Sequence, residues 1–319
     1  MSALASPASF KGALGAVEAA AALAAGFRAA GAAVEELPIA DGGDGTLDVL
    51  HRALGGELRS AMVSDPFLRP VAGAWLLLPD GTAVVEAAQA IGLARLTPDE
   101  LDPLRASSRG LGELIHAAID DAPDSLLVGL GGTATVDGGA GLLEVLGGFP
   151  RPVRVACDVA NPLLGPRGAA RVFGPQKGAS PDDVETLERR LAARRSLAPF
   201  ASLPGAGAAG GLGAALAALG GELVAGAPLI LDVLGFRRRA REAQLVVTGE
   251  GQVDATTFEG KGPGEVVRIC DEEGVRSVLA AGQVAERPPG VEVHTLDGGP
   301  DRTRDDLAAL GSALASTLA

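Results

Sequence analysis

The sequence has little of what marks a disulfide-stapled, aromatic-rich or nucleic-acid-binding protein. Its 319 residues include two cysteines, no tyrosine and 3% aromatic residues, and the net charge is −13. Two cysteines, Cys157 and Cys270, are too few for a disulfide framework and indicate a reducing, cytoplasmic environment. The negative charge argues against nucleic acid and anionic membranes as partners. We therefore expect a core of Ala, Val and Leu, and small molecules as ligands.

Membrane-directed segments are not expected either. The start, MSALASPASFKG, has no basic region followed by an apolar one, so it predicts no signal peptide. The longest uncharged stretch, residues 203–221, approaches the length of a membrane span but contains seven glycines. An Ala-rich helix that follows a glycine loop explains it better.

Lysine is scarce, and its placement is unusual. Lys11, Lys177 and Lys261 are the only lysines, and glycine follows each of them. They could be remnants of a coding bias toward arginine. Alternatively, arginine could not replace them, because an ammonium group is compact where a guanidinium group is a planar fork. We favour the second interpretation, with phosphate as the natural ligand of such lysines.

Apolar strand-like segments alternate with helical patterns, which is typical of α/β proteins. Strands are predicted at 2–6, 34–41, 57–64, 72–78, 82–88, 125–130, 153–159, 244–251, 276–282 and 291–299. Helices are predicted at about 13–30, 46–54, 111–120, 180–195, 264–273 and 303–317. Glycine-rich turns are expected directly after strands, at 42–45, 131–132, 249–251 and 298–299. That edge of an open α/β sheet is where ligands bind.

Three of these segments carry candidate chemistry. DGGDGT (41–46) could orient a hydroxyl group or hold Mg²⁺, although a tight turn with Asp44 as a helix cap would also explain it. GLGGTATVDGG (129–139) could bind phosphate through its amides. Its G-x-G-x-x-A pattern raises a dinucleotide site, but the following Asp-Gly-Gly-Ala-Gly is poor helix material. In ACDVANP, Asp158 suits a catalytic base or metal ligand, or an Asx turn.

Other common catalytic patterns have no support. There is no G-x-x-x-x-G-K-[ST] phosphate loop, and the three histidines have no metal-ligand spacing. We interpret His51, His116 and His294 as structural. A Ser-His-Asp hydrolase is not indicated.

Taken together, the motifs resemble the glycerate kinase family of the type without a P-loop. Ten stretches carry the resemblance in the family's order: SFKGALGA (9–16), PIADGGDGT (38–46), DPFLRPV (65–71), VVEAAQAIGL (84–93), SSRGLGELI (107–115), GLGGTATVDGGAG (129–141), ACDVANPLLG (156–165), VFGPQKGA (172–179), PGAGAAGGLGAAL (204–216) and VVTGEGQVDATTFEGKGP (246–263).

The resemblance implies two α/β domains, a flavodoxin-like parallel sheet interrupted by an inserted second α/β domain. We expect the first at 1–65 plus 236–319 and the second at 66–235. It also implies ATP- and Mg²⁺-dependent phosphorylation of D-glycerate to 2-phosphoglycerate. Phosphorylation of the 3-hydroxyl, the oligomeric state and the pathway stay open.

The resemblance also implies roles for residues of this sequence. The lysines would neutralise charge during phosphoryl transfer. Which carboxylate acts as base and which bind metal stays open. The candidates are, for catalysis, Asp158, Lys11, Lys261 and Asp41; for substrate or phosphate binding, Ser9, Gly42, Gly43, Gly131, Gly132, Thr133, Lys177 and Glu250; and for metal binding, Asp44, Asp137 and Asp254.

Three departures from the family pattern stand out. Ala8 stands where the family usually has an aspartate in a PDSFK-like start, the first strand SALAS is weaker than the family's, and the GGFPRP connection (147–152) is shorter than usual. Ala8 leaves alternatives open. The alternatives are a kinase for another small hydroxy acid and a non-catalytic relative that binds nucleotide or glycerate. Retention of all three lysines and the acidic residues favours an active kinase.

Overall fold

The computed structural model describes residues 2–258 and 260–318. Glu259, in the glycine-rich stretch 249–263, lies outside that range. The chain divides into two compact units. Unit 1 comprises 1–41, 48–54 and 227–319, and unit 2 comprises 42–47 and 55–226. These bounds differ from the expected ones, because 42–47 and 55–65 belong to unit 2 and 227–235 to unit 1.

Unit 1 is built on a five-stranded, all-parallel sheet in the order β11-β10-β9-β1-β2. Numbered along the unit, this order is 2-1-3-4-5, which is the flavodoxin-like order. The expected fold is therefore confirmed for this unit. Its strands are β1 (Ser2–Ala5), β2 (Ala33–Glu36), β9 (Leu245–Val253), β10 (Arg276–Val284) and β11 (Glu292–Thr295).

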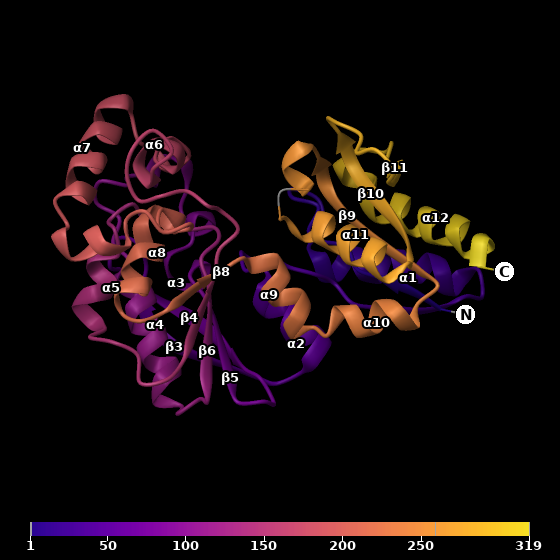
Figure 1. Cartoon of the computed structure of the whole chain (residues 1–319), viewed down its shortest axis with the longest axis horizontal. Coiled ribbons are helices and arrows are strands. Elements are labelled where there is room, and N and C mark those ends of the chain that lie inside the picture. Colours follow the sequence, from indigo (N-terminus) through magenta and orange to yellow (C-terminus); the bar gives the residue numbers. More distant parts are fainter. Residues whose placement is uncertain (1, 259, 319) are drawn as a thin grey trace. The chain divides into compact units, whose positions relative to one another are not determined.

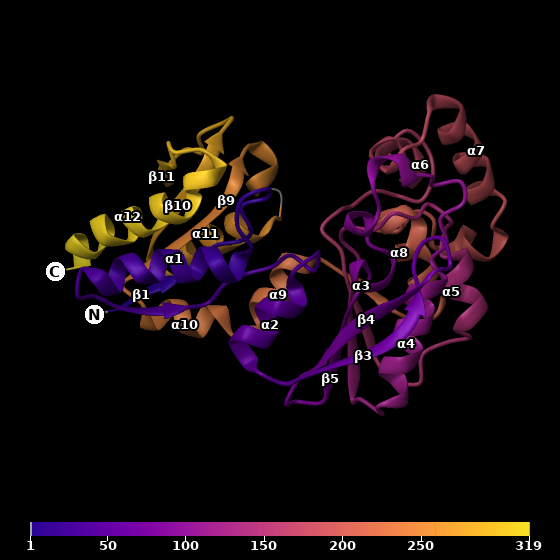
Figure 2. The ribbon, with the colours of Figure 1, turned by 180° about the vertical axis from the view of Figure 1, so that it is seen from behind.

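Helices cover both faces of this sheet (Figures 1 and 2). One face is covered by α1 (Ala16–Ala29) and α12 (Thr303–Ala315), whose apolar residues form one core with β1, β9 and β10. The other carries α10 (Phe236–Glu242) and α11 (Gly262–Glu273). Gly26 and Gly311 let α1 and α12 approach closely, since a Cβ atom at Gly26 would lie 1.9 Å from the Ala308 carbonyl oxygen. The chain passes between the units after Asp41, within α2 (Thr46–Leu54), at the end of α2, and within α9 (Gly226–Val233).

Unit 2 contains a mixed six-stranded sheet in the order β3-β4-β5-β6-β7-β8. The pairs β3–β4 and β4–β5 are antiparallel, and the other pairs are parallel. The strands are β3 (Glu57–Ser64), β4 (Pro70–Leu77), β5 (Thr82–Glu86), β6 (Ser125–Gly129), β7 (Val153–Ala156) and β8 (Glu222–Val224).

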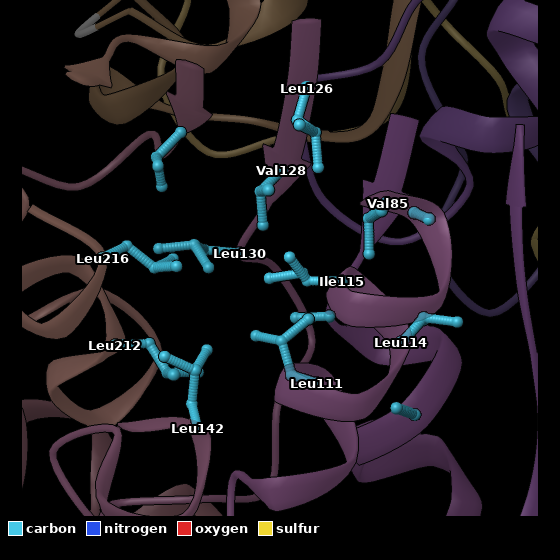
Figure 3. Close-up of a cluster of buried hydrophobic side chains, with 14 of the residues drawn as sticks. Val85, Leu111, Leu114, Ile115, Leu126, Val128, Leu130, Leu142, Leu212 and Leu216 are labelled. Atoms are coloured by element: carbon cyan, nitrogen blue, oxygen red, sulfur yellow. The ribbon is translucent and has the colours of Figure 1, made fainter. Parts of the chain in front are cut away.

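The core of unit 2 lies where the sheet meets its helices. Val85 of β5 and Leu126 and Val128 of β6 pack with leucine and isoleucine side chains of three helices (Figure 3). The helices of the unit are α3 (Ala88–Ile91), α4 (Arg109–Asp120), α5 (Ala140–Val145), α6 (Ala169–Phe173), α7 (Pro181–Ala192) and α8 (Ala208–Ala218). Ser180 caps α7, as its sequence predicts.

Two glycine-rich segments differ from expectation. The turn expected at 249–251 is wrong, because β9 continues to Val253 and Gly249 lets the Ala280 carbonyl oxygen of β10 approach. The Ala-rich helix exists as α8, but Ala209, Gly210 and Gly211 have positive φ values of 52°, 72° and 95°. Within the described residues no helix is long and apolar enough to cross a membrane.

Candidate active site

The first candidate cluster lies in unit 1, where the order of its sheet reverses direction. That point is between β1 and β9, and ligands of open α/β sheets bind outside the carboxyl ends of strands there. The segment after β1 stays beside β9, because the Ser6 amide donates to the Val247 carbonyl (2.7 Å) and the Ala8 amide to Gly249 (2.8 Å). This pairing leads the chain through half-buried Ser9 to the exposed Lys11.

Glycine at position 251 allows β9 to pass close to Lys11. A Cβ atom there would lie 3.2 Å from the Lys11 backbone nitrogen. The segment that follows β2 runs beside the segment that follows β1, since the Ile39 amide donates to the Pro7 carbonyl (3.0 Å). Asp41 follows it and is half-buried. The sequence segments around 9–11, 39–41 and 250 thus meet at the carboxyl edge of the unit 1 sheet.

Glu250 is the most buried carboxylate of this cluster. Its Oε1 accepts a hydrogen bond from the Thr257 hydroxyl (2.7 Å). Burial raises the pKa of Glu250, with Asp254 adding to the rise, while the Thr257 bond and the ammonium groups of Lys261 and Lys11 oppose it. Both lysines are therefore close enough to act electrostatically on one carboxylate. We refer to Lys11, Glu250, Asp254 and Lys261 as the unit 1 cluster.

Asp254 and Lys261 are joined through the short 3₁₀ helix Ala255–Phe258. Oδ1 of Asp254 accepts hydrogen bonds from the Thr256 amide (2.9 Å) and hydroxyl (2.5 Å), which lower the pKa of Asp254. The Lys261 ammonium lies 3.9 Å from the same oxygen. Lys261 is also the N-cap residue of α11, whose amide dipoles favour an anion at that end. Two cations and a helix N-terminus therefore share one edge with two carboxylates.

The second cluster lies in unit 2, at the carboxyl ends of β6 and β7. Gly42 and Gly43 of the DGGDGT segment pack closely against these ends and the loop that follows β6. A Cβ at Gly42 would lie 2.5 Å from the Ala156 Cβ, and one at Gly131 would lie 2.3 Å from the Gly43 Cα. The sequence segments 42–44 and 129–132, whose glycines are candidates for binding substrate or phosphate, are thus in direct contact.

Two exposed aspartates accompany these loops. Asp44 is adjacent to Gly132, since a Cβ there would lie 3.6 Å from the Asp44 Cβ. Asp158 follows β7, and its Oδ1 accepts a hydrogen bond from the Gly226 amide (3.1 Å). We refer to Asp44, Gly131, Gly132, Thr133 and Asp158 as the unit 2 cluster.

Glu86 is a residue that sequence reasoning did not single out. It ends β5, is only 2% exposed, and accepts a hydrogen bond from the Leu47 amide. It thereby holds the end of the DGGDGTL segment on the unit 2 sheet. A signal was present, because Glu86 is the only charged residue in the apolar stretch TAVVEAAQAIGL.

Asp137 and Lys177 support the glycine loop from within unit 2. The Asp137 carboxylate accepts hydrogen bonds from the Ser108 amide (2.9 Å) and hydroxyl (2.8 Å) and from the Gly139 (3.0 Å) and Gly141 (3.2 Å) amides. These bonds fix the orientation of the Asp137 carboxylate within the loop. Lys177 is 4% exposed, and burial lowers its pKa to about 7. Its ammonium donates to the Thr133 hydroxyl and the Thr135 carbonyl.

A ready-made metal cage is not visible in the part of the chain that the structure describes. No group of three or more His, Cys, Asp or Glu side chains there could hold an ion. Mg²⁺ at kinase sites is commonly held by one or two carboxylates together with substrate phosphates. Asp44 and Asp254 each provide a carboxylate beside a group suited to phosphate, so the donor chemistry fits an ion that enters with a nucleotide.

Comparison with known proteins identifies the family to which this arrangement belongs. The sequence model of the glycerate kinase family matches residues 3–149 and 151–299. The chain belongs to the glycerate kinase family. It is 38% identical to the glycerate kinase of Bacillus subtilis and 37% identical to the glycerate 2-kinase of Escherichia coli, with 91% of this chain and 87% of each relative covered. It is accordingly a kinase.

A solved structure of the glycerate kinase family has the same fold. A crystal structure assigned as glycerate kinase 2 from Salmonella typhimurium LT2 superposes with a TM-score of 0.84 at 33% identity, over 100% of this chain and 98% of that one. The expected family and fold are thus confirmed. Ala8 lies half-buried beside β9 in unit 1, next to the segment that carries Lys11.

Proposed function

We propose that the chain transfers the γ-phosphate of ATP to the 2-hydroxyl group of D-glycerate and releases ADP and 2-phosphoglycerate. The observation that carries this proposal is the unit 1 cluster at the switch point of a flavodoxin-like sheet, where the Lys261 ammonium lies 3.9 Å from Asp254 and β9 passes close to the Lys11 backbone. The names of the relatives, a glycerate kinase and a glycerate 2-kinase, support the substrate.

The lysines suit the charge that phosphoryl transfer develops. The bond between the γ-phosphorus and its bridging oxygen breaks, and a bond to the glycerate oxygen forms. Negative charge grows on the bridging oxygen and is spread over the transferred group. We assign Lys11 and Lys261 to neutralise that charge, with the N-terminus of α11 adding amide dipoles. Ser9 lies in the same segment as Lys11 and is assigned to substrate binding.

The glycine loops suit phosphate through their amides. The segments containing Gly42, Gly43, Gly131 and Gly132 have little side-chain bulk, so backbone N–H groups can approach an anion closely. We assign this surface and Thr133 to binding of phosphate or of the glycerate carboxylate.

A carboxylate must accept the proton that leaves the glycerate hydroxyl. We assign this role to Asp158, whose orientation is fixed by the hydrogen bond from the Gly226 amide, with Asp41 as a further catalytic candidate. Asp44 in unit 2 and Asp254 in unit 1 are separate candidates to hold Mg²⁺. When bound, the ion would neutralise charge on the phosphates of ATP.

The setting of the reaction follows from the thiols and the charge. Cys157 and Cys270 are free, and burial raises their pKa values to about 11 and 12, so neither is a reactive thiolate. Such thiols fit a reducing cytoplasm. We therefore propose a cytoplasmic enzyme that acts on glycerate and ATP, without nucleic acid as a partner.

The test is ADP release from ATP and Mg²⁺ by the purified protein, with and without D-glycerate. The product is identified with enolase, which consumes 2-phosphoglycerate directly but 3-phosphoglycerate only after a mutase is added. Glycerate-dependent ADP release with a direct enolase signal is expected. A signal that needs the mutase would move the reaction to the 3-hydroxyl. ATP-dependent thermal stabilisation without any turnover would instead indicate a non-catalytic relative, with Ala8 as the residue to restore to aspartate.

A further inference from the structure

The three lysines of the chain are in different surroundings. Lys11 is exposed and Lys261 is half-buried in the unit 1 cluster, whereas Lys177 is 4% exposed inside unit 2. An ammonium group in the interior costs free energy unless hydrogen bonds replace its water. For Lys177 two acceptors do so, the Thr135 carbonyl oxygen at 2.8 Å and the Thr133 hydroxyl oxygen at 3.2 Å.

The glycine after Lys177, Gly178, is required by the conformation of the backbone. Lys177 ends the 3₁₀ helix Pro175–Lys177, and Gly178 terminates it with a φ of 97°. A Cβ atom at Gly178 would also lie 2.7 Å from both the Cβ and the carbonyl oxygen of Leu101. Gly178 is thus required for a left-handed turn against a neighbouring segment, and this requirement does not involve a ligand.

Both acceptors of Lys177 belong to the loop that carries the exposed Gly132. The backbone of this loop is held on its other side, where the Leu93 amide donates to the Gly132 carbonyl (2.7 Å) and the Ala134 amide to the Ile91 carbonyl (2.9 Å). The Lys177 ammonium adds two further hydrogen bonds to this loop, one to the Thr133 hydroxyl and one to the Thr135 carbonyl group. Because the ammonium only donates, the Thr133 hydroxyl keeps its own proton for another acceptor.

We propose that Lys177 is a positioning residue. It fixes Thr133 and the loop 131–135 in the conformation that binds substrate, and does not itself touch a phosphate. This inference rests on the proposed phosphate-binding role of the loop. It differs from the charge-neutralising role assigned to Lys11 and Lys261.

The first test uses the wild-type protein and the scarcity of lysine. Reductive methylation with formaldehyde is followed by peptide mass spectrometry, with and without ATP and Mg²⁺. We expect methylation of Lys11 and Lys261 and at least tenfold slower methylation of Lys177 in both conditions. Lys177 that is methylated as fast as Lys11, and is protected by ATP, would overturn the inference. Failure of ATP to protect Lys11 and Lys261 would instead count against the proposed function and leave the role of Lys177 standing.

The second test is a double-mutant cycle on turnover with Lys177→Met and Thr133→Val. Each single change should lower kcat by roughly 10–100-fold, as misplacement of a substrate-binding group does, with less than about threefold change in the KM for ATP. If Lys177 acts through Thr133, the double variant should lie within about threefold of the more impaired single variant. Losses that multiply would contradict the inference.

Lys11→Met is the matched control in that cycle. Lys11 is in unit 1 and does not share the Thr133 hydroxyl, so its loss should multiply with that of Lys177→Met. Circular dichroism establishes that each variant is folded. Should Lys177→Met not fold, the methylation experiment on the wild-type chain decides the question.

Discussion

The Thr257 hydroxyl lies 2.7 Å from Oε1 of Glu250 and donates a hydrogen bond to this half-buried carboxylate. This bond opposes the rise in the pKa of Glu250 that burial causes. Thr257 itself is fully buried. The pair links the carboxyl edge of β9 to the segment that leads into α11.

Glu250→Gln should raise stability at neutral pH and lower activity. The pKa of Glu250 is raised in the folded state, so the folded chain holds this proton more tightly than the unfolded chain. Its contribution to stability is present below pH 4.5 and is lost as pH rises through the folded-state pKa. We expect Glu250→Gln to raise the melting temperature at pH 7–8 but not near pH 4, while turnover falls roughly tenfold. A melting temperature that drops at pH 7 would contradict this account.

Lys11→Met and Lys261→Met should each impair turnover far more than folding. Loss of one charge-stabilising donor commonly lowers kcat by about 10²–10³-fold. Because Lys11 is exposed and Lys261 is half-buried, urea unfolding should change little. Arg287→Met, at an exposed position of the same unit, is the control and should keep full activity. Equal losses of stability and activity would favour a structural role for the lysines.

Gly131→Ala should destabilise unit 2 and impair catalysis together. The added Cβ would lie 2.3 Å from the Gly43 Cα, so the two loops must separate. Overpacking of this kind costs about 1–3 kcal/mol. Gly147→Ala is the control, since nothing lies within 4 Å of a Cβ there. Urea midpoints and kcat are measured for both, and similar behaviour of the two variants would refute the described contact.

Mg²⁺ should bind with the nucleotide and not alone. Within residues 2–258 and 260–318 no preformed group of three metal ligands is present. Millimolar Mg²⁺ by itself should therefore leave the melting temperature unchanged, whereas Mg²⁺ with ATP should raise it and EDTA should abolish turnover. A clear upward shift with Mg²⁺ alone would reveal a metal site that the described residues do not form.

Stability should rise with pH just above neutrality because of Lys177. Burial lowers the pKa of Lys177 from its usual 10.5 to about 7 in the folded chain. The unfolded chain therefore binds more protons than the folded chain at pH values between these two. Unfolding free energy should therefore increase by up to about 1.4 kcal/mol per pH unit from pH 7 to 8. Above that range the raised pKa values of Cys157 and Cys270 act in the opposite direction. Lys177→Met should flatten the rise, and an unchanged slope would argue against the lowered pKa of Lys177.

The sequence predicted most elements because their patterns are local. The run SLLVG alternates with helical segments and is β6, and Ser180 with its following acids starts α7 as expected. The three-residue strand β8 and the helices α3, α5, α6, α9 and α10 were not predicted. Their short segments, such as ELV, have no periodicity of their own and are ordered by tertiary contacts.

The loops of the candidate site could be predicted from the sequence, but their division between the two units could not. Sequence alone could mark the lysines and the glycine segments, but not that Asp41 and Gly42 fall in different units. It also could not distinguish Lys177 from the other lysines, because burial of its ammonium depends on Thr133 and Thr135, about forty residues away. The sequence likewise could not show the four hydrogen bonds that the Asp137 carboxylate accepts, because two of them come from Ser108, 29 residues away.

The parallel sheet of unit 1 has a consequence for synthesis on the ribosome. Ala3 of β1 pairs on one side with Val34 and on the other with Leu245. This central strand therefore cannot complete its pairing until the last quarter of the chain is synthesised. All strands of unit 2 lie between Glu57 and Val224 and emerge earlier. Nascent chains therefore carry an assembled unit 2 while β1 still has one open side. During that interval Ala3, Leu4 and Ala5 lie on a strand with an unpaired edge, which can pair with another chain and lead to aggregation.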